Sequence, residues 1–300
     1  MESTAKEKLH AFKPWHSFFV GIDSDGCVFD TMEIKQKECF IPNLIKYWKL
    51  QAVSKYVRAA AEFVNLYSKW RGVNRFPALT KTVELLRDWP EAMRSGAAIP
   101  DLTNLQAWID SGTALSNPAL EAEVSRTGDP VLKQALEWSK AVNRSIAERV
   151  VGVPPFPSFR ACLEKLAPRA DIICVSVASG EALEREWQDH DIAKYAAVLA
   201  GQEMGCKKDH LRIAAVGRYA KDCVLMIGDA PGDLAAARAN GALFFPITPG
   251  YEEQSWERFY REGVERFFNQ TYTGSYEASL IEEFKKLLPE VPPWKRAVGR

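Results

Sequence analysis

The chain has 300 residues, which is long for one compact core and suits a core with a second lobe. Hydrophobic residues make up 47% and charged residues 26%, as in ordinary globular proteins. Lysine plus arginine and aspartate plus glutamate are equal at 39 each, which argues against a nucleic-acid coat protein or a polybasic membrane-binding protein. Its longest apolar runs are far too short to span a bilayer.

None of the six cysteines forms a C-x-x-C pair, and this disfavours a structural zinc site. The N-terminus lacks the apolar stretch and the cleavage site of a secretory signal. We therefore expect a cytoplasmic protein with free thiols.

The first element in chain order, after a loosely attached lead-in over residues 1–16, is a short buried strand over 17–22. It ends abruptly in Asp23-Ser24-Asp25-Gly26. In open α/β sheets, ligands bind at the carboxyl edge of the strands. The pattern therefore predicts that this strand delivers acidic side chains to such an edge.

Residues 32–151 show helical periodicity and no convincing strand. Apolar residues recur at helical spacing in Val131, Ala135, Trp138 and Val142. We expect a separate helical domain here, of a size typical of domains. Three prolines between 152 and 157 predict a stiff connector back to the core.

Strands and helices alternate over residues 152–250. This alternation predicts an α/β fold, a Rossmann-like three-layer core with a parallel sheet, into which the helical domain is inserted. Residues 251–300 are aromatic and charged, and we expect a helical extension packed on the core. The predicted strands cover 171–176, 197–199, 223–227 and 242–245, and the predicted helices begin near 181, 208 and 234.

Acidic residues follow two of these strands, first Asp23 and Asp25, then Asp229 and Asp233. Each motif alone is typical of a turn or a helix cap. Together, at one edge of a parallel sheet, four carboxylates would repel one another unless a cation were present. Oxygen ligands and phosphate chemistry point to Mg²⁺.

The segment Asp23-Ser24-Asp25-Gly26-Cys27-Val28-Phe29-Asp30 resembles the first motif of the haloacid dehalogenase-like hydrolase superfamily. Ser176, Lys207, and Gly228-Asp229 with Asp233 are similar to its second, third and fourth motifs, in the expected order. The helical insert resembles the family's C1-type cap domain but is larger than usual.

The resemblance implies a phosphatase-type mechanism. Asp23 would be the nucleophile and Asp25 the general acid and base. Asp23, the backbone carbonyl of Asp25, and Asp229 would hold Mg²⁺. An acid at position 25 favours phosphate esters over halides and phosphonates, because an alkoxide leaving group needs a proton.

The resemblance also gives roles to the remaining motif residues. Ser176 would donate a hydrogen bond to the phosphoryl group, although Ser179 also lies at the strand end. Lys207 would pair with the phosphate and Asp23, although Lys208 is adjacent. Asp233 would support the metal or the lysine.

Arg71 and Arg75 flank a glycine between two predicted helices. Arginine grips a carboxylate or a second phosphate bidentately, so these residues are candidates for substrate specificity. The competing interpretation is an ordinary interhelical loop.

We expect an Mg²⁺-dependent phosphohydrolase acting on a small phosphorylated metabolite, with no nucleic-acid or membrane partner. The alternatives are a sugar-phosphate mutase of the β-phosphoglucomutase type and a non-catalytic ligand-binding protein on the same fold. The substrate cannot be inferred from the motifs.

Overall fold

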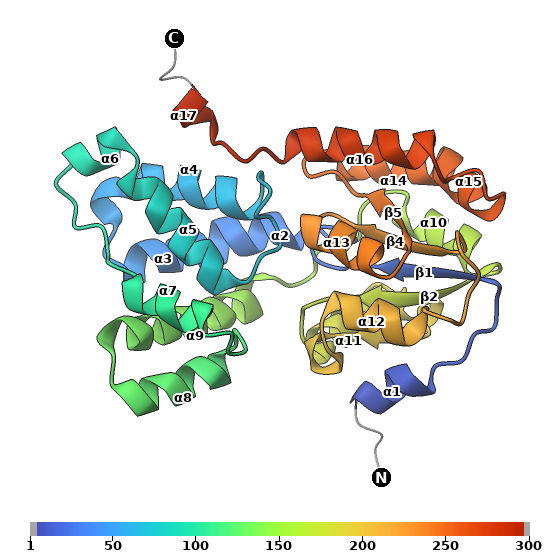
Figure 1. Ribbon diagram of the computed structural model, residues 1–300, viewed down its shortest axis with the longest axis horizontal. Coiled ribbons are helices and arrows are strands. Elements are labelled where there is room, and N and C mark those ends of the chain that lie inside the picture. The colour runs from blue at the N-terminus through green and yellow to red at the C-terminus, as the bar shows by residue number, and fades with distance from the viewer. Residues whose placement is uncertain (1–4, 297–300) are drawn as a thin grey trace. The chain divides into compact units, whose positions relative to one another are not determined.

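The computed structural model describes residues 5–296 and divides the chain into two compact units (Figure 1). The core unit comprises Met1–Thr31 and Gly152–Leu287. The helical unit comprises Met32–Val151 and Leu288–Arg300.

The core unit is built on one sheet of five parallel strands in the order β3-β2-β1-β4-β5. At its centre, Ile22 of β1 lies beside Cys174 of β2 and Ile227 of β4. The carboxyl ends of all five strands therefore meet at one edge, and the predicted α/β fold class is confirmed. The strands are β1 (Phe18–Ile22), β2 (Ala170–Val175), β3 (Val198–Ala200), β4 (Val224–Gly228) and β5 (Leu243–Pro246).

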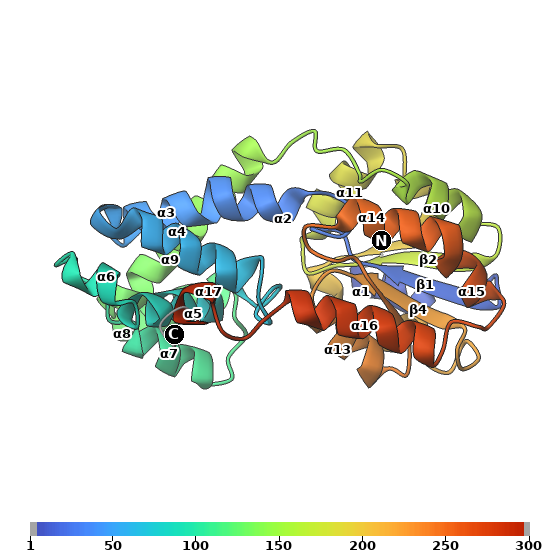
Figure 2. The ribbon, with the colours of Figure 1, turned by 90° about the horizontal axis from the view of Figure 1, so that it is seen from above.

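Helices cover both faces of this sheet, and Figure 2 shows α10, α11 and α14 on one side and α13 and α16 on the other. Alternate side chains along β1 supply the two faces, because successive residues of a strand point in opposite directions. Val20 and Ile22 join the cluster with α10, α11 and α14. The helices of the core unit, apart from α1, are α10 (Phe159–Leu166), α11 (Gly180–Asp189), α12 (Lys207–Ala214), α13 (Pro231–Ala239), α14 (Glu252–Arg258), α15 (Val264–Phe268) and α16 (Ser275–Leu287), with a π-helical turn, η5 (Phe259–Gly263), between α14 and α15.

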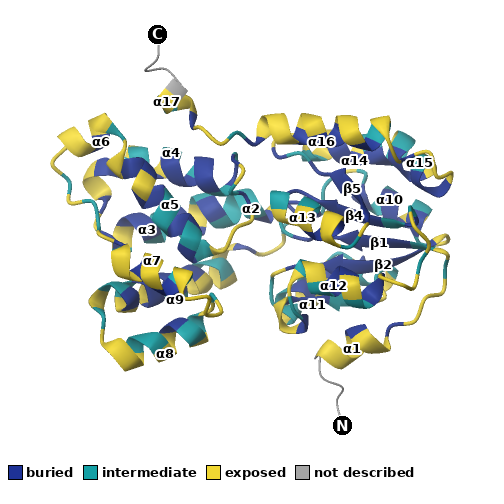
Figure 3. Cartoon of the chain, viewed as in Figure 1, coloured by how far each residue is buried: buried dark blue, intermediate teal, exposed yellow. Residues whose placement is uncertain are grey.

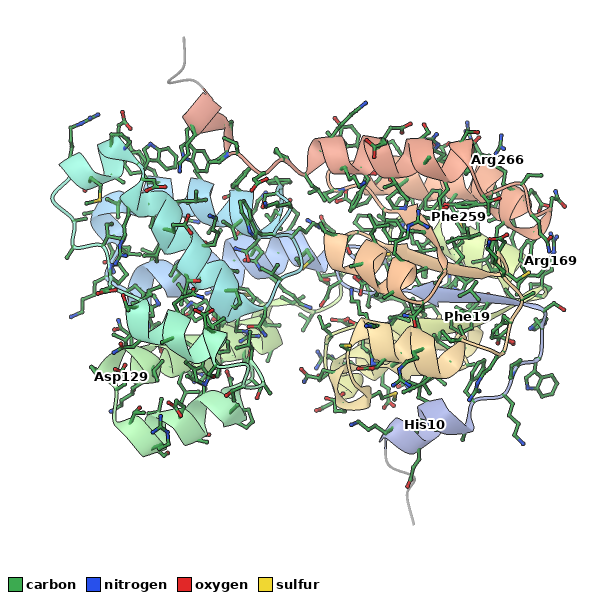
Figure 4. The ribbon with its side chains drawn as sticks, viewed as in Figure 1. His10, Phe19, Asp129, Arg169, Phe259 and Arg266 are labelled. Carbon is green, nitrogen blue, oxygen red and sulfur yellow. The ribbon has the colours of Figure 1, made fainter. Side chains whose placement is uncertain are left out.

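Aromatic contacts attach the outer segments to the sheet. Phe259, labelled in Figure 4, packs on Phe245 of β5 with ring centroids 4.7 Å apart. Phe19 of β1, on the other face, packs on Tyr219 with centroids 5.2 Å apart. The strands are dark blue and the outer side of α16 is yellow in Figure 3, which shows that the sheet forms the buried centre.

Residues 5–16 are not the loose lead-in expected from the sequence; residues 1–4 of that predicted lead-in lie outside the described residues. Helix α1 (Ala5–Ala11) buries Leu9 completely, and the backbone N–H groups of Trp15 and His16 donate to the Asp171 carboxylate. Tyr219 Oη donates to the same carboxylate at 2.7 Å. These hydrogen bonds could not be predicted from the sequence, because Asp171 looks like an ordinary polar residue at the start of a strand.

The helical unit contains no strand among its described residues. It has its own core, in which buried apolar side chains from α3, α4, α5, α7 and α9 pack together. Its helices are α2 (Thr31–Ile34), α3 (Ile41–Tyr47), α4 (Ser54–Asn65), α5 (Arg75–Arg87), α6 (Pro90–Arg94), α7 (Thr103–Asp110), α8 (Asn117–Thr127), α9 (Pro130–Arg149) and α17 (Pro293–Arg296), together with a π-helical segment, η1 (Lys35–Phe40), and a short 3-10 turn, η2 (Gln51–Val53).

The expectation that residues 251–300 form one extension packed on the core is wrong for the end of the chain. Residues from Leu288 onward belong to the helical unit. Trp294 stacks on Trp89 with ring centroids 4.2 Å apart, and Lys295 pairs with Asp88 at 2.7 Å. A tail whose one helix has four residues carries no periodic signal that would show which unit it joins. Within residues 5–296, no helix is both long and apolar enough to cross a membrane.

Candidate active site

Asp23 comes directly after β1, and hydrogen bonds hold both its backbone and its side chain. Its N–H donates to the Ile227 carbonyl of β4, and its Oδ1 accepts from the N–H of Ser24 at 2.8 Å. The chain then turns at Gly26, whose φ of +75° suits glycine because it has no Cβ. The turn keeps Asp23 at the edge of the sheet with only 4% of its surface exposed.

Asp229 and Asp233 enter the same edge from β4 and α13. Asp229 follows the last residue of β4, and Asp233 lies in the first turn of α13, where its Oδ2 accepts from the N–H of Ala230. Asp233 packs so closely on Gly228 that a Cβ at 228 would lie 2.4 Å from its Oδ2. A glycine at 228 is therefore required for this position of Asp233.

Lys207, the first residue of α12, links the two motifs. Its Nζ lies 2.6 Å from Asp23 Oδ2 and 2.5 Å from Asp233 Oδ1. The adjacent Lys208 is exposed. The structure thus brings Lys207, and not Lys208, to the predicted nucleophile.

Burial and mutual electrostatic interactions change the pKa values of Asp23, Asp233 and Lys207. Burial raises the pKa of Asp23 well above its usual value; Lys207 opposes this, and the Asp233 and Asp229 carboxylates add to it. Burial also raises the pKa of Asp233. For Lys207, burial works against the charged form, but the carboxylates outweigh it and raise its pKa. Ionising Asp23 is therefore unfavourable unless more positive charge is supplied.

The cluster fits a divalent metal ion. Carboxylate oxygens of Asp23, Asp229 and Asp233 all lie within 4.8 Å of one another. Lys207 contacts two of these carboxylates, and the carboxylates of Asp229 and Asp233 raise the pKa of Asp23. A hard, doubly charged cation with oxygen ligands, as Mg²⁺ is, matches both the donor atoms and the charge.

Asp25 lies two residues beyond Asp23, and its Oδ1 accepts a 2.5 Å hydrogen bond from Thr31 Oγ1. Thr31 is 1% exposed. Thr31 was not predicted as a site residue, because it ends the core segment and lies outside the acidic motif. A threonine six residues after the acid is the sequence signal that could have identified it.

Ser176 and Ser179 both follow β2 but have different surroundings. Ser176 is 1% exposed, and its Oγ accepts from the N–H of Ala178. Ser179 caps α11 by accepting from the N–H of Ala182. Ser179 thus has a structural task, whereas Ser176 lies nearer the end of the strand.

Trp187 is a further residue that the motifs did not indicate. It is fully buried on α11, and its Nε1 donates to Ser24 Oγ at 3.1 Å. It therefore fixes the turn that carries Asp23 and Asp25. A lone tryptophan on an amphipathic helix reads as core, so no signal in the sequence shows this contact.

Arg71 and Arg75 lie in the helical unit and do not form a surface pair. Arg71 is 2% exposed, and its Nη1 donates to the Leu66 carbonyl. Arg75 begins α5, and its Nη1 donates to Ser139 and Asn143 of α9. The two guanidinium groups thus have different hydrogen-bond partners, and their role in substrate specificity stays a prediction.

No protein-family model and no curated protein matches the chain. Solved structures similar to it include a haloacid dehalogenase-superfamily hydrolase, subfamily IA, from Geobacter sulfurreducens, with 17% identity, TM-score 0.39, and 77% of this chain and 88% of that chain covered. A haloacid dehalogenase-like family hydrolase from Xanthomonas campestris has 11% identity and TM-score 0.44, over 87% and 97% of the two chains. A protein provisionally named a phosphoglycolate phosphatase, from Lactobacillus delbrueckii, has 13% identity and TM-score 0.46, over 82% and 92%. Each is a likeness in fold alone.

Proposed function

We propose that the chain is a phosphohydrolase that cleaves a small phosphomonoester through an aspartyl-phosphate on Asp23. The observation that carries this proposal is the Lys207 ammonium bridging Asp23 and Asp233 at the carboxyl edge of the sheet, beside Asp229. A nucleophile, a countercharge and a set of metal ligands are thereby combined at one place.

The proposed reaction has two steps. A carboxylate oxygen of Asp23 bonds to phosphorus while the ester P–O bond breaks, and Asp25 gives its proton to the leaving alkoxide. Asp25 then takes a proton from water, whose oxygen bonds to phosphorus and displaces Asp23. Inorganic phosphate leaves, and both carboxyl groups return to their first state.

Other side chains of the core unit support this chemistry. Thr31 holds Asp25, and Trp187 holds the turn between the two acids. Lys207 offsets the negative charge that an approaching phosphate would meet at Asp23. Ser176 is close to the strand end and would donate a hydrogen bond to a phosphoryl oxygen.

Asp23 and Asp229 would hold Mg²⁺, with the backbone carbonyl of Asp25 as a further ligand and Asp233 in support. When bound, such an ion offsets carboxylate–phosphate repulsion and stabilises charge in the transition state.

A mutase would use the same residues but would pass the phosphoryl group back to a sugar. Because the two activities would use identical catalytic groups, a mutase and a phosphatase are distinguished by their products. A non-catalytic binding protein is disfavoured because Asp23, Asp25 and Asp229 are all retained.

The test is phosphate release from a panel of phosphorylated metabolites, with Mg²⁺ and after EDTA treatment, by wild type and Asp23→Asn. We expect release that EDTA abolishes, that Mg²⁺ restores, and that falls by about four orders of magnitude or more in the variant. Asp189→Asn, an exposed acid of the core unit outside the motifs, is the matched control. Substantial activity in folded Asp23→Asn would contradict the covalent mechanism, and interconversion of sugar phosphates without release would indicate a mutase.

A further inference from the structure

The two buried tryptophans of the core unit, Trp187 and Trp256, both donate their indole N–H to the turn that follows β1. Trp187 Nε1 lies 3.1 Å from Ser24 Oγ, and Trp256 Nε1 lies 2.7 Å from the Cys27 carbonyl oxygen. Both tryptophans and both acceptor residues are fully buried. The donors come from α11 and α14, which lie on the same face of the sheet (Figure 2). The turn is thus held at two points, one on each side of Asp25.

The tryptophans of the helical unit show that burial of an indole does not by itself lead to such a contact. Four of them bury Nε1 without an acceptor among residues 5–296, namely Trp48, Trp108, Trp138 and Trp294. In the core unit, by contrast, two tryptophans from separate helices donate to one turn, and this turn follows the predicted nucleophile. Packing of large side chains alone does not account for this convergence.

Trp256 is itself held firmly in the core. Phe159 of α10 contacts both tryptophans, with ring centroids 4.8 Å from Trp256 and 6.1 Å from Trp187. Ser255 Oγ accepts from the N–H of Thr248, which lies just beyond β5, at 3.0 Å. The end of the sheet therefore fixes α14, and the donor at Trp256 is a rigid one.

The turn that receives these hydrogen bonds has a flexible centre. Gly26 has no Cβ and a φ of +75°. Val28 N–H donates to the Ser24 carbonyl at 2.8 Å, but Asp25 lies between Ser24 and Cys27, inside the loop that this bond closes. Displacement of a catalytic group by about 1 Å can lower a rate by roughly two orders of magnitude. Holding both flanks of Asp25 is therefore important for a reaction that uses this acid.

We propose that Trp256 is a positioning residue for Asp25: from α14 it holds the Cys27 carbonyl and, together with Trp187, fixes the acid and its backbone carbonyl. The inference rests on the proposed function, in which Asp25 is the general acid and base. It gives the segment after β5 a role in the active site, because this segment supplies one of the two tryptophans that hold the turn.

The test compares Trp256→Phe with Tyr272→Phe in the full chain. Trp256→Phe keeps an aromatic ring but removes the N–H that reaches Cys27. Tyr272 is the matched control, because it is also fully buried after β5 and its Oη donates to the Phe244 carbonyl at 2.8 Å. Its acceptor belongs to β5 and not to the turn. Each variant loses one buried hydrogen bond to a backbone carbonyl, so both should lower the melting temperature by a few degrees.

Steady-state kinetics on the best substrate of the panel separate positioning from stability. Trp256→Phe should lower kcat about tenfold and change KM by less than about twofold, because the acid is displaced while the ester is still bound. Tyr272→Phe should leave both constants unchanged. Trp187→Phe removes the other donor to the turn and should lower kcat by a factor similar to that of Trp256→Phe.

Hydrogen–deuterium exchange followed by mass spectrometry observes the turn without relying on activity. In a peptide that covers residues 23–30, the backbone amides should exchange about tenfold faster in Trp256→Phe than in the wild type. The same peptide should be unchanged in Tyr272→Phe. If the wild type releases no phosphate but shows this difference, the hold on the turn is supported and the proposed function is contradicted.

Two outcomes would overturn the proposal. The first is exchange at the turn, or a kcat in active enzyme, that Trp256→Phe leaves unchanged. The second is an equal loss of kcat in Trp256→Phe and Tyr272→Phe, which would reflect stability alone. Should Trp256→Phe fail to fold, Trp187→Phe takes its place, and wild-type exchange at the turn in that variant would overturn the proposal.

Discussion

The two units each contain a partly buried basic side chain, but they compensate its charge in opposite ways. In the core unit, Lys207 contacts Asp23 and Asp233, and the surrounding carboxylates raise its pKa. In the helical unit, Arg75 contacts only neutral groups, and burial lowers its pKa. The first site groups three carboxylates with one ammonium, whereas no acid contributes to the pKa of Arg75. The comparison suggests a bound cation for the first site.

This difference predicts opposite responses to removing the two basic groups. Breaking a buried ion pair leaves uncompensated charge, whereas replacing an uncompensated buried charge by an apolar side chain of similar length relieves desolvation. The following predictions test the contrast, from the largest expected effect to the smallest.

Lys207→Met should cost about 3–5 kcal/mol of unfolding free energy, because it leaves buried carboxylates without their countercharge. Chemical denaturation in metal-free buffer measures this. Lys208→Met is the matched control and should change stability by less than about 0.5 kcal/mol, since its side chain is exposed. Equal effects of the two substitutions would show that Lys207 is not held by the cluster.

The metal-free protein should lose stability as pH rises from about 4, relative to Asp23→Asn. The pKa of Asp23 is raised in the folded state above the ordinary value of 3.8, so the folded state binds more protons than the unfolded state in this range. Stability therefore falls with increasing pH until the raised pKa is passed. The loss amounts to about 1.4 kcal/mol for each unit by which the pKa is raised.

Unfolding curves of both proteins between pH 4 and neutrality, roughly the range where carboxyl groups titrate, would measure this difference. Mg²⁺ should reduce it, because binding of the cation favours the ionised carboxylate. A difference that does not change with pH would mean that Asp23 titrates like an exposed acid.

Thr31→Val should lower kcat about tenfold, which corresponds to about 1.4 kcal/mol in the barrier, because Asp25 loses the hydroxyl that orients it. KM should change little, since Thr31 positions the acid without touching the ester. Thr31→Ser keeps the hydroxyl and should recover most of the activity. Steady-state kinetics on the best substrate of the panel decide this, and a pure rise in KM would argue against a positioning role.

The sequence sufficed for the α/β core because its strands are short apolar runs that end in acidic loops. The same local pattern located Asp23, Asp229 and Asp233, since neighbouring parallel strands bring their ends together. It could not choose between Lys207 and Lys208, because a shift of one residue on a helix turns the side chain by about 100°.

The helical unit was harder to interpret. Arg71 and Arg75 are close in the sequence, but one is fixed to the Leu66 carbonyl and the other reaches α9. The surroundings of Arg75 come from η1 and α9, which are far from it along the chain. Helical periodicity identifies which face is buried but not which distant polar group meets it, and it gave no sign of the π-helical segment.

The smallest expected effect completes the contrast with Lys207. Arg75→Met should change the unfolding free energy by no more than about 1 kcal/mol in anion-free buffer. The variant loses hydrogen bonds to Ser139 and Asn143, but it also removes a buried charge that no carboxylate of the described chain offsets, and these contributions oppose each other. A loss as large as that of Lys207→Met, measured without any anion, would mean that Arg75 is already compensated and that the two units do not differ as described.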